Sequence, residues 1–209
     1  MRAFAAASSE AGELILIEPL RKRLQEAAPS VRVDWSPSHA ESTIEDLRNG
    51  RFHFVIDIVG ESAEAPDVRA TNLFDDTLAT LARPNHPFLK RRTDAEVFAA
   101  AEHVSVDSLP GFRELGGGSS QTKLAVRQGS QVSSTLVGVL ATLNSDALLT
   151  LPASLAGILE RQFGLARVAQ PVEPVTFPGR LLWHTSYDRD ECHQWLRGEF
   201  TGIAAEFAV

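Results

Sequence analysis

One strand-like stretch limits how this chain can fold more than any other feature of the sequence. Residues 73–82, LFDDTLATLA, read as a β-strand and run directly into Arg83-Pro84-Asn85-His86-Pro87. The two prolines remove two ladder donors and push the residues before them into extended conformations, so a tight hairpin is excluded. We therefore predict that strand 73–82 leaves one folding unit and that the chain continues into a second.

The residues before this strand alternate between strand and helix patterns. The expected elements are a buried strand at 2–7, a helix at 13–27 after the caps Ser8-Ser9, a strand at 31–36, a helix within 39–50 and a strand at 51–59. Ser42 and Glu45 have the spacing of a capping box at the start of the second helix. This β-α-β-α-β order predicts a largely parallel sheet with helices on both faces.

The same alternation restarts beyond the prolines. A capping box at Thr93–Glu96 opens a short helix, and strands at 103–108, 122–128 and 146–152 and helices at 133–144 and 153–163 follow. After the proline-spaced stretch 171–179, a strand at 180–186 and a helix at 188–200 complete the chain. We predict an α/β fold of two Rossmann-like lobes joined by two crossover strands. Lobe I comprises 1–82 plus 180–209 and lobe II comprises 83–179, and the extended crossings suit a hinge.

Composition excludes several classes of protein. The formal net charge of -7 argues against binding nucleic acid through the general surface. Cys192 is the single cysteine, which excludes an intramolecular disulfide and a thiolate-rich metal site and fits a reducing compartment. No apolar run reaches membrane-spanning length, and Glu10 and Glu13 interrupt the N-terminal stretch before a signal peptide could develop. We expect a cytoplasmic protein with no membrane partner and no cofactor.

Several short motifs, in order, resemble a known family. They are LFDD followed by ARPNHP, the pattern L..G..H..I between Leu47 and Ile56, TLPASLA at 150–156, and LLWH...D...QWLR near the end. Their order and spacing resemble the effector-binding region of LysR-type transcriptional regulators over essentially the whole chain. The last motif is most similar to the branch of nodulation-type and nitroaromatic- or salicylate-responsive activators.

The resemblance implies a fold, a ligand and partners. The fold would be of the type 2 periplasmic-binding-protein-like kind, with a small-molecule effector in the inter-lobe cleft and a homodimer or tetramer as the assembly. In the dimer, the helix from Glu13 to Ala27 would pack against the partner, and Leu24→Asp would weaken it. DNA would be contacted only through an N-terminal winged helix-turn-helix domain, which this sequence lacks, so the chain is either a regulatory fragment or a natural remnant.

Two positions depart from the family pattern. His53 stands where the family usually has an aspartate, and the stretch GFRELGGGSSQ at 111–121 is glycine-rich where relatives carry a helix. The usual role of the first position is therefore in question, and the second could reshape one wall of the cleft.

The candidate effector-binding residues follow predicted strands. In open parallel sheets, ligands gather beyond the carboxyl ends of strands, where helix N-termini carry about half a positive charge. The candidates are Ser8, Ser9, His39, Thr43, Ser133, Ser134, Thr135 and His184. We hypothesise that they bind a carboxylate or a similarly anionic or aromatic effector. The alternatives are that the serines only cap helices, that His39 is a solvated loop residue, and that Trp183 faces the cleft in place of His184.

Catalytic motifs are missing from the sequence. It contains no G-x-S-x-G, P-loop, G-x-G-x-x-G or H-E-x-x-H pattern, and Cys192 and His193, as helix neighbours, point about 100° apart. We expect neither catalytic nor metal-binding residues. The rival hypothesis is an enzyme of dehydratase or lyase type on the same scaffold, with His39 and His184 as its acid/base candidates. A transporter's solute-binding protein is a weaker rival because no signal peptide was found.

Overall fold

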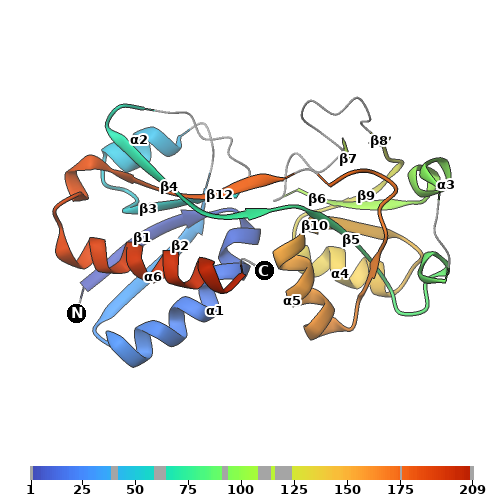
Figure 1. Cartoon of the computed structure of the whole chain (residues 1–209), viewed down its shortest axis with the longest axis horizontal. Helices are drawn as coiled ribbons and strands as arrows, with labels where there is room; N and C mark the ends of the chain where they lie inside the picture. The colour runs from blue at the N-terminus through green and yellow to red at the C-terminus, as the bar shows by residue number, and fades with distance from the viewer. Residues whose placement is uncertain are drawn as a thin grey trace. The chain divides into compact units, whose positions relative to one another are not determined.

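The computed structural model describes residues 2–38, 42–58, 65–90, 94–107, 114–115, 124–174 and 176–207. The chain divides into two compact units, and each contains its own sheet and helices (Figure 1). Unit 1 comprises Met1–Asp75 and Phe177–Val209, and unit 2 comprises Asp76–Thr176. The chain therefore passes from one unit to the other twice.

The sheet of unit 1 has five strands in the order β2-β1-β3-β12-β4. Their bounds are β1 Arg2–Ser8, β2 Val31–Pro37, β3 Phe54–Asp57, β4 Val68–Asp76 and β12 Phe177–His184. Strand β1 pairs in parallel with both β2 and β3, whereas β12 runs antiparallel to β3. The parallel sheet predicted from the first half of the chain is therefore present, with an antiparallel strand added from the end of the sequence.

Helices cover both faces of this sheet, as Figure 1 shows. Helices α1 (Glu10–Ala27) and α6 (Glu191–Phe207) lie on one face, and Arg23 joins them through ion pairs with Glu199 and Glu206. The short helix α2 (Thr43–Arg48) lies on the other face. Its Leu47 packs in a buried cluster with Ala7, Phe52, Val55 and Leu182. Alternation along the strands explains this division, since successive residues face opposite sides of a sheet.

The sheet of unit 2 also has five strands, in the order β11-β5-β10-β6-β9. The bounds are β5 Leu78–Ala82, β6 His103–Val106, β9 Gln128–Val132, β10 Leu148–Pro152 and β11 Ala166–Val168, with a separate pair β7 Glu114–Leu115 and β8 Leu124–Ala125. The helices are η1 Pro87–Leu89, α3 Ala95–Ala100, α4 Thr135–Leu143 and α5 Ala153–Phe163. Strand β6 is parallel to β9 and β10, and β5 is antiparallel to β10 and β11.

The stretch 73–82 is two strands and not one. Strand β4 ends at Asp76, and β5 begins at Leu78 and forms its ladder with β10 and β11, so the chain enters unit 2 before the prolines. The prolines lie in a turn inside unit 2, where Asn85 has φ 65° and Pro87 begins η1. The change of unit lies between Asp75 and Asp76, seven residues before the expected boundary after residue 82. Likewise, β12 begins at Phe177, three residues before the strand expected at 180–186.

A buried histidine links α6 to the sheet of unit 1. His193 is fully buried and stacks between Phe54 and Tyr187, with ring centroids 4.0 Å and 4.9 Å away. Its Nε2 donates to the carbonyl oxygen of His53 at 3.1 Å, and its Nδ1 accepts from Arg197 at 2.7 Å. This pattern requires a neutral ring with its proton on Nε2. Burial, followed by the nearby Arg197 charge, lowers the pKa of His193 to about 4.

This histidine predicts that acid weakens the fold. The pKa of His193 lies below the ordinary value of 6.5, so between pH 6.5 and 4 the unfolded chain binds a proton that the folded chain does not. The free energy of unfolding should therefore be fully retained above pH 6.5 and fall by on the order of 3 kcal/mol as the pH drops to 4. Chemical denaturation across this range measures it. His193→Leu should flatten the dependence, and an unchanged slope in that variant would refute the assignment.

Candidate functional site

The carboxyl edge of the unit 1 sheet carries the first predicted residues. Strand β1 ends at Ser8, and Ser9 then caps α1 by accepting a hydrogen bond from the backbone N–H of Gly12 at 3.3 Å. Ser9 is half-buried, so its side chain can be reached. The predicted position at a helix start is therefore confirmed for Ser9, and its capping role is compatible with contact to a ligand.

Ser8 lies differently from its neighbour. Its side chain is buried, with 1% exposed, and its hydroxyl donates to the carbonyl oxygen of Ile56 at 3.4 Å. Strand alternation turns Ser8 toward α1, where Gly12 leaves just enough room for it. Ser8 is thus part of the packing between β1, β3 and α1 and is inaccessible to an effector in this structure.

The segment after β2 contains two of the predicted effector-binding residues, His39 and Thr43. His39 lies outside the described residues. Thr43, at the first position of α2, has 3% of its surface exposed. Ser42 precedes it but makes no side-chain capping bond within the described residues; its hydroxyl donates to Asp46 at 2.7 Å. The predicted capping box is therefore wrong here, and Thr43 belongs to the interior of unit 1.

Sequence reasoning missed an ion pair at the same edge. Arg180 of β12 pairs with Asp57 of β3 at 2.9 Å, and their side chains are 19% and 9% exposed. Ser8 pairs with Ile56 and Arg180 with Asp57, so the pair lies one residue beyond the end of β1, beside Ser9. Asp57 and Arg180 are 123 residues apart in the sequence, and only the antiparallel pairing of β3 with β12 brings them together.

That register also corrects the prediction for His184. Strand β12 runs opposite to β3, so its carboxyl end, where His184 lies, is at the amino end of β3. There, His184 accepts a hydrogen bond from the Ser186 backbone and lies 3.5 Å from Asp67. Asp67 is held by Arg48, whose hydrogen bonds lower the pKa of that carboxyl to about 2. His184 therefore belongs to a polar cluster at the edge remote from Ser9.

In unit 2, the remaining candidates lie where β9 leads into α4. Ser133 is exposed and Ser134 is half-buried, while Thr135 is buried with 1% exposed. Ser134 is the N-cap of α4, yet its side chain makes no capping bond within the described part of the chain. The first turn of α4 contains no acidic residue. The hydroxyls of Ser133 and Ser134 therefore lie beside the first-turn N–H groups of α4. Asp107 follows β6 at the same edge, and its carboxylate accepts from the Gln131 side chain at 2.7 Å.

Other kinds of site find little support in the described ranges. No group of three or more His, Cys, Asp or Glu side chains there could hold a metal ion. No helix among those residues is long and apolar enough to cross a membrane. The hydroxyls of Ser9 in unit 1 and of Ser133 and Ser134 in unit 2 can each donate a hydrogen bond to an acceptor or an anion.

Comparison with known proteins identifies the family. Residues 6–202 match the model of the LysR substrate binding domain. The chain belongs to this family. It is 31% identical to the HTH-type transcriptional regulator SyrM of Rhizobium meliloti (strain 1021), over 92% of this chain and 59% of SyrM. It is 26% identical to the HTH-type transcriptional activator NagR of a Ralstonia species, over 98% of this chain and 68% of NagR.

The solved structures agree on the fold. The regulatory domain of MexT, a transcriptional activator in Pseudomonas aeruginosa, superposes with a TM-score of 0.77 at 17% identity, covering 96% of this chain and 99% of that one. The resemblance and the periplasmic-binding-protein-like α/β fold predicted from sequence are confirmed. The chain is a LysR-type effector-binding domain, and it spans less than two thirds of the length of SyrM. The rival enzyme finds no support among these relatives.

The packing around Ser8 gives a test of its assignment. In Gly12→Ala, the added methyl group would overlap the Ser8 hydroxyl and lie 3.1 Å from Ile58 Cγ1, which should destabilise unit 1 by about 1–3 kcal/mol. Removing the hydroxyl in Ser8→Ala/Gly12→Ala should restore part of that loss. Gly198→Ala is the control, because a Cβ there meets nothing within 4 Å and should stabilise α6 by roughly 0.5–1 kcal/mol. Equal stability of Gly12→Ala and the wild type in urea denaturation would show that Ser8 can leave its buried position.

Proposed function

We propose that this domain senses a small molecule carrying an acidic group and passes its presence to the DNA-binding part of a cytoplasmic transcriptional regulator. The observation that carries the proposal is the match of residues 6–202 to the LysR substrate binding domain. The relatives SyrM and NagR, which are named as transcriptional regulators, support the same role. For the ligand to act as a signal, it must bind one conformation of the domain better than another.

The start of α4 is the best-suited place for the acidic group. Its first turn has no acidic side chain, and the hydroxyls of Ser133 and Ser134 lie beside its N–H groups. The nearby carboxylate of Asp107 belongs to the end of β6 and already accepts from the Gln131 side chain. The start of α1 has Ser9 but also Glu10 and Glu13 in the first turn, which oppose a second negative charge. We therefore assign the effector's acidic group to Ser133 and Ser134 of unit 2.

A thermal-shift screen against small aromatic and aliphatic acids tests this assignment. An acid at about 100 times its dissociation constant should add about 2.7 kcal/mol of stability, which raises the melting temperature by a few degrees for a chain of this size. Ser134→Ala should remove most of the shift. Ser145→Ala, at the opposite end of α4, is the matched control and should keep it, because the Ser145 hydroxyl is bonded to Ala141 and Ala147.

The same samples separate a sensor from an enzyme. An acid that shifts the melting temperature and is recovered unchanged supports sensing. Recovery of a chemically altered acid would support the enzyme instead. A shift that survives in Ser134→Ala would place the acidic group elsewhere in the domain.

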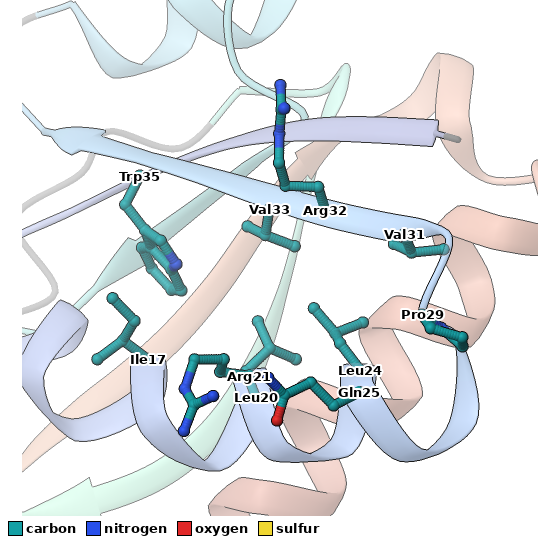
Figure 2. A pocket seen from close by; sticks show the side chains of 10 residues that line it. All are labelled: Ile17, Leu20, Arg21, Leu24, Gln25, Pro29, Val31, Arg32, Val33 and Trp35. Carbon is teal, nitrogen blue, oxygen red and sulfur yellow. The ribbon is translucent and has the colours of Figure 1, made fainter.

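The surface between α1 and β2 is suited to self-association of the chain. A groove of about 340 Å³ runs between α1 and β2, and Figure 2 shows Ile17, Leu20 and Leu24 of the helix facing Val33 and Trp35 of the strand. The exposed fraction of Ile17 is 36%. Helix α4 has an exposed apolar face of its own, formed by Leu136, Val137 and Leu140. We infer that a second copy of the chain covers the groove by laying an apolar helix into it.

Ile17→Asp tests this surface better than a change at Leu24. Leu24 is only 8% exposed, so an aspartate there would disturb unit 1 itself. Ile17→Asp should weaken self-association by roughly tenfold or more, at least about 1.4 kcal/mol, in sedimentation equilibrium. Val97→Asp adds the same charge at a 41% exposed position on α3 and should leave association unchanged. Equal dissociation constants for Ile17→Asp and the wild type would remove the groove from the interface.

A further inference from the structure

One face of the unit 2 sheet carries a row of polar side chains. We call it the polar row, and it consists of Gln131 of β9, Ser105 of β6, Thr150 of β10 and Thr80 of β5. The pairing of β9 with β6, of β6 with β10 and of β10 with β5 sets these four residues side by side. Residues opposite each other on neighbouring strands point to the same side of a sheet. The four uncharged side chains are therefore neighbours on one face.

Helix α4 covers the opposite face of the sheet. A Cβ added at Gly138 would lie 3.2 Å from Val106, and Val106 and Ser105 point to opposite sides of β6. The polar row lies beside a buried apolar cluster, which consists of Ala82, Phe98, Leu148 and Val168. Thr80 is fully buried, whereas Ser105 and Thr150 are half-buried, so a small ligand can reach the middle of the row.

The hydrogen bonds of Thr80 run in one direction. Its hydroxyl oxygen lies 2.7 Å from the Thr150 hydroxyl and accepts from the Gln170 side-chain amide at 2.9 Å. An amide NH2 group only donates, so Gln170 requires Thr80 to accept. Since Thr80 has 0% of its surface exposed, leaving its own hydroxyl hydrogen unused would be costly. In the described part of the chain, Thr150 is the remaining partner of this hydroxyl, so Thr80 donates to Thr150.

This direction leaves the hydroxyl hydrogen of Thr150 available. Thr150 accepts from Thr80, and its hydroxyl has no further partner among the described residues. The Ser105 hydroxyl, on the next strand, has no side-chain hydrogen bond within the same ranges. At the exposed end of the row, Gln131 donates to Asp107 at 2.7 Å. The middle of the polar row therefore presents two neighbouring hydroxyl donors.

We propose that Thr150 and Ser105 form a subsite for an uncharged oxygen acceptor of the effector, such as a carbonyl group. Thr80 and Gln170 are positioning residues, because they orient the Thr150 hydroxyl without contacting the ligand. The polar row contains no cationic side chain, so a neutral oxygen suits it better than a carboxylate. The effector is then an acid that also carries a neutral oxygen. That statement rests on the proposed function, but the preference of the subsite can be tested without an acid.

Two matched ring compounds test the preference. Cyclopentanone only accepts hydrogen bonds, and pyrrole donates through its N–H group and has no carbonyl, while both are neutral and similar in size. Each is titrated into the isotope-labelled chain, and the NMR signals of Thr150 and Ser105 report binding at the polar row. The wild type should bind cyclopentanone roughly threefold to tenfold more tightly than pyrrole, which corresponds to one net hydrogen bond.

Gln170→Glu should shift this preference toward pyrrole. At about pH 8, the new carboxylate accepts the Thr80 hydrogen, so Thr80 accepts from Thr150 and the Thr150 oxygen becomes an acceptor for the ligand. The ratio of the two dissociation constants should move toward pyrrole by roughly threefold or more. A purely structural role of Gln170 would lower stability without moving the ratio. Gln162→Glu is the matched control, because it adds the same charge at an exposed position of α5 and should keep the wild-type ratio.

Ser105→Ala is the second variant and leaves the bonds of Thr80 intact. It removes one donor, so it should weaken the binding of cyclopentanone by roughly threefold and leave that of pyrrole unchanged, with Thr150 as the reporting signal. This variant decides the matter if Gln170→Glu does not fold.

Three results would overturn the subsite: equal affinity of the wild type for the two rings or binding of neither at the polar row, a ratio unchanged in both Gln170→Glu and Ser105→Ala, or a change of the same size in Gln162→Glu. None of these depends on an acid. A preference for cyclopentanone with a failed acid screen would keep the subsite and reject the acidic effector. A successful acid screen with equal ring affinities would keep the acidic effector and reject the subsite.

Discussion

The antiparallel pairing of β12 with β3 is the constraint on which the arrangement of unit 1 depends. Three strands of its sheet, β1, β2 and β3, run in one direction, and a strand from the far end of the sequence is inserted against them in the other. This register sets Arg180 beside Asp57 at the edge where α1 begins and sends His184 to the opposite edge. It also carries the chain into α6, whose His193 closes the core against Phe54. The pairing of β12 with β3 therefore sets both the position of the Asp57–Arg180 ion pair and the packing of α6 in unit 1.

How much of this could be read from sequence depends on the range of the interaction involved. Local signals located two helix starts: Ser9 caps α1, and α4 begins where Ser133 and Ser134 predicted it. The capping box expected at Ser42 and Glu45 did not form. Side-chain direction and strand register are not local. Ser8 and Ser9 point to different sides because successive residues of a strand alternate. His184 was grouped with Ser9 because nothing near it in the sequence shows that β12 is antiparallel to β3. The Asp57–Arg180 pair could not be found for the same reason. Residues 73–82 read as one strand because a single residue, Thr77, separates β4 from β5. The evidence for two strands is non-local, since β5 pairs with β10 and β11.

His53 shows how a departure from the family pattern is accommodated. The resemblance placed an aspartate at this position, and an ionised carboxylate would need polar partners there. The histidine accepts a hydrogen bond from the Ala5 backbone through Nδ1 at 3.0 Å and packs edge-on against Phe4 at 5.2 Å. Burial lowers the pKa of His53, so the ring is neutral near pH 7. Its carbonyl oxygen then accepts from His193, and the two neutral rings form one continuous aromatic packing with Phe4 and Phe54.

The helix starts differ in charge, and that difference matters more for ligand choice than the hydroxyls that cap them. Capping serines and threonines occur wherever helices begin, so they carry little information about a ligand. Acidic side chains near a helix start are more informative, since each offsets the positive end that an anion would use. Helix α1 has Glu10 and Glu13, and α5 has Asp76, whereas the first turn of α4 has none. For α4, the nearby carboxylate of Asp107 belongs to the end of β6 and accepts from Gln131. Of these three helix starts, α4 is therefore the one whose own first turn carries no acidic residue and whose N–H groups donate to no carboxylate within the described residues, so an acid would meet the least opposition there.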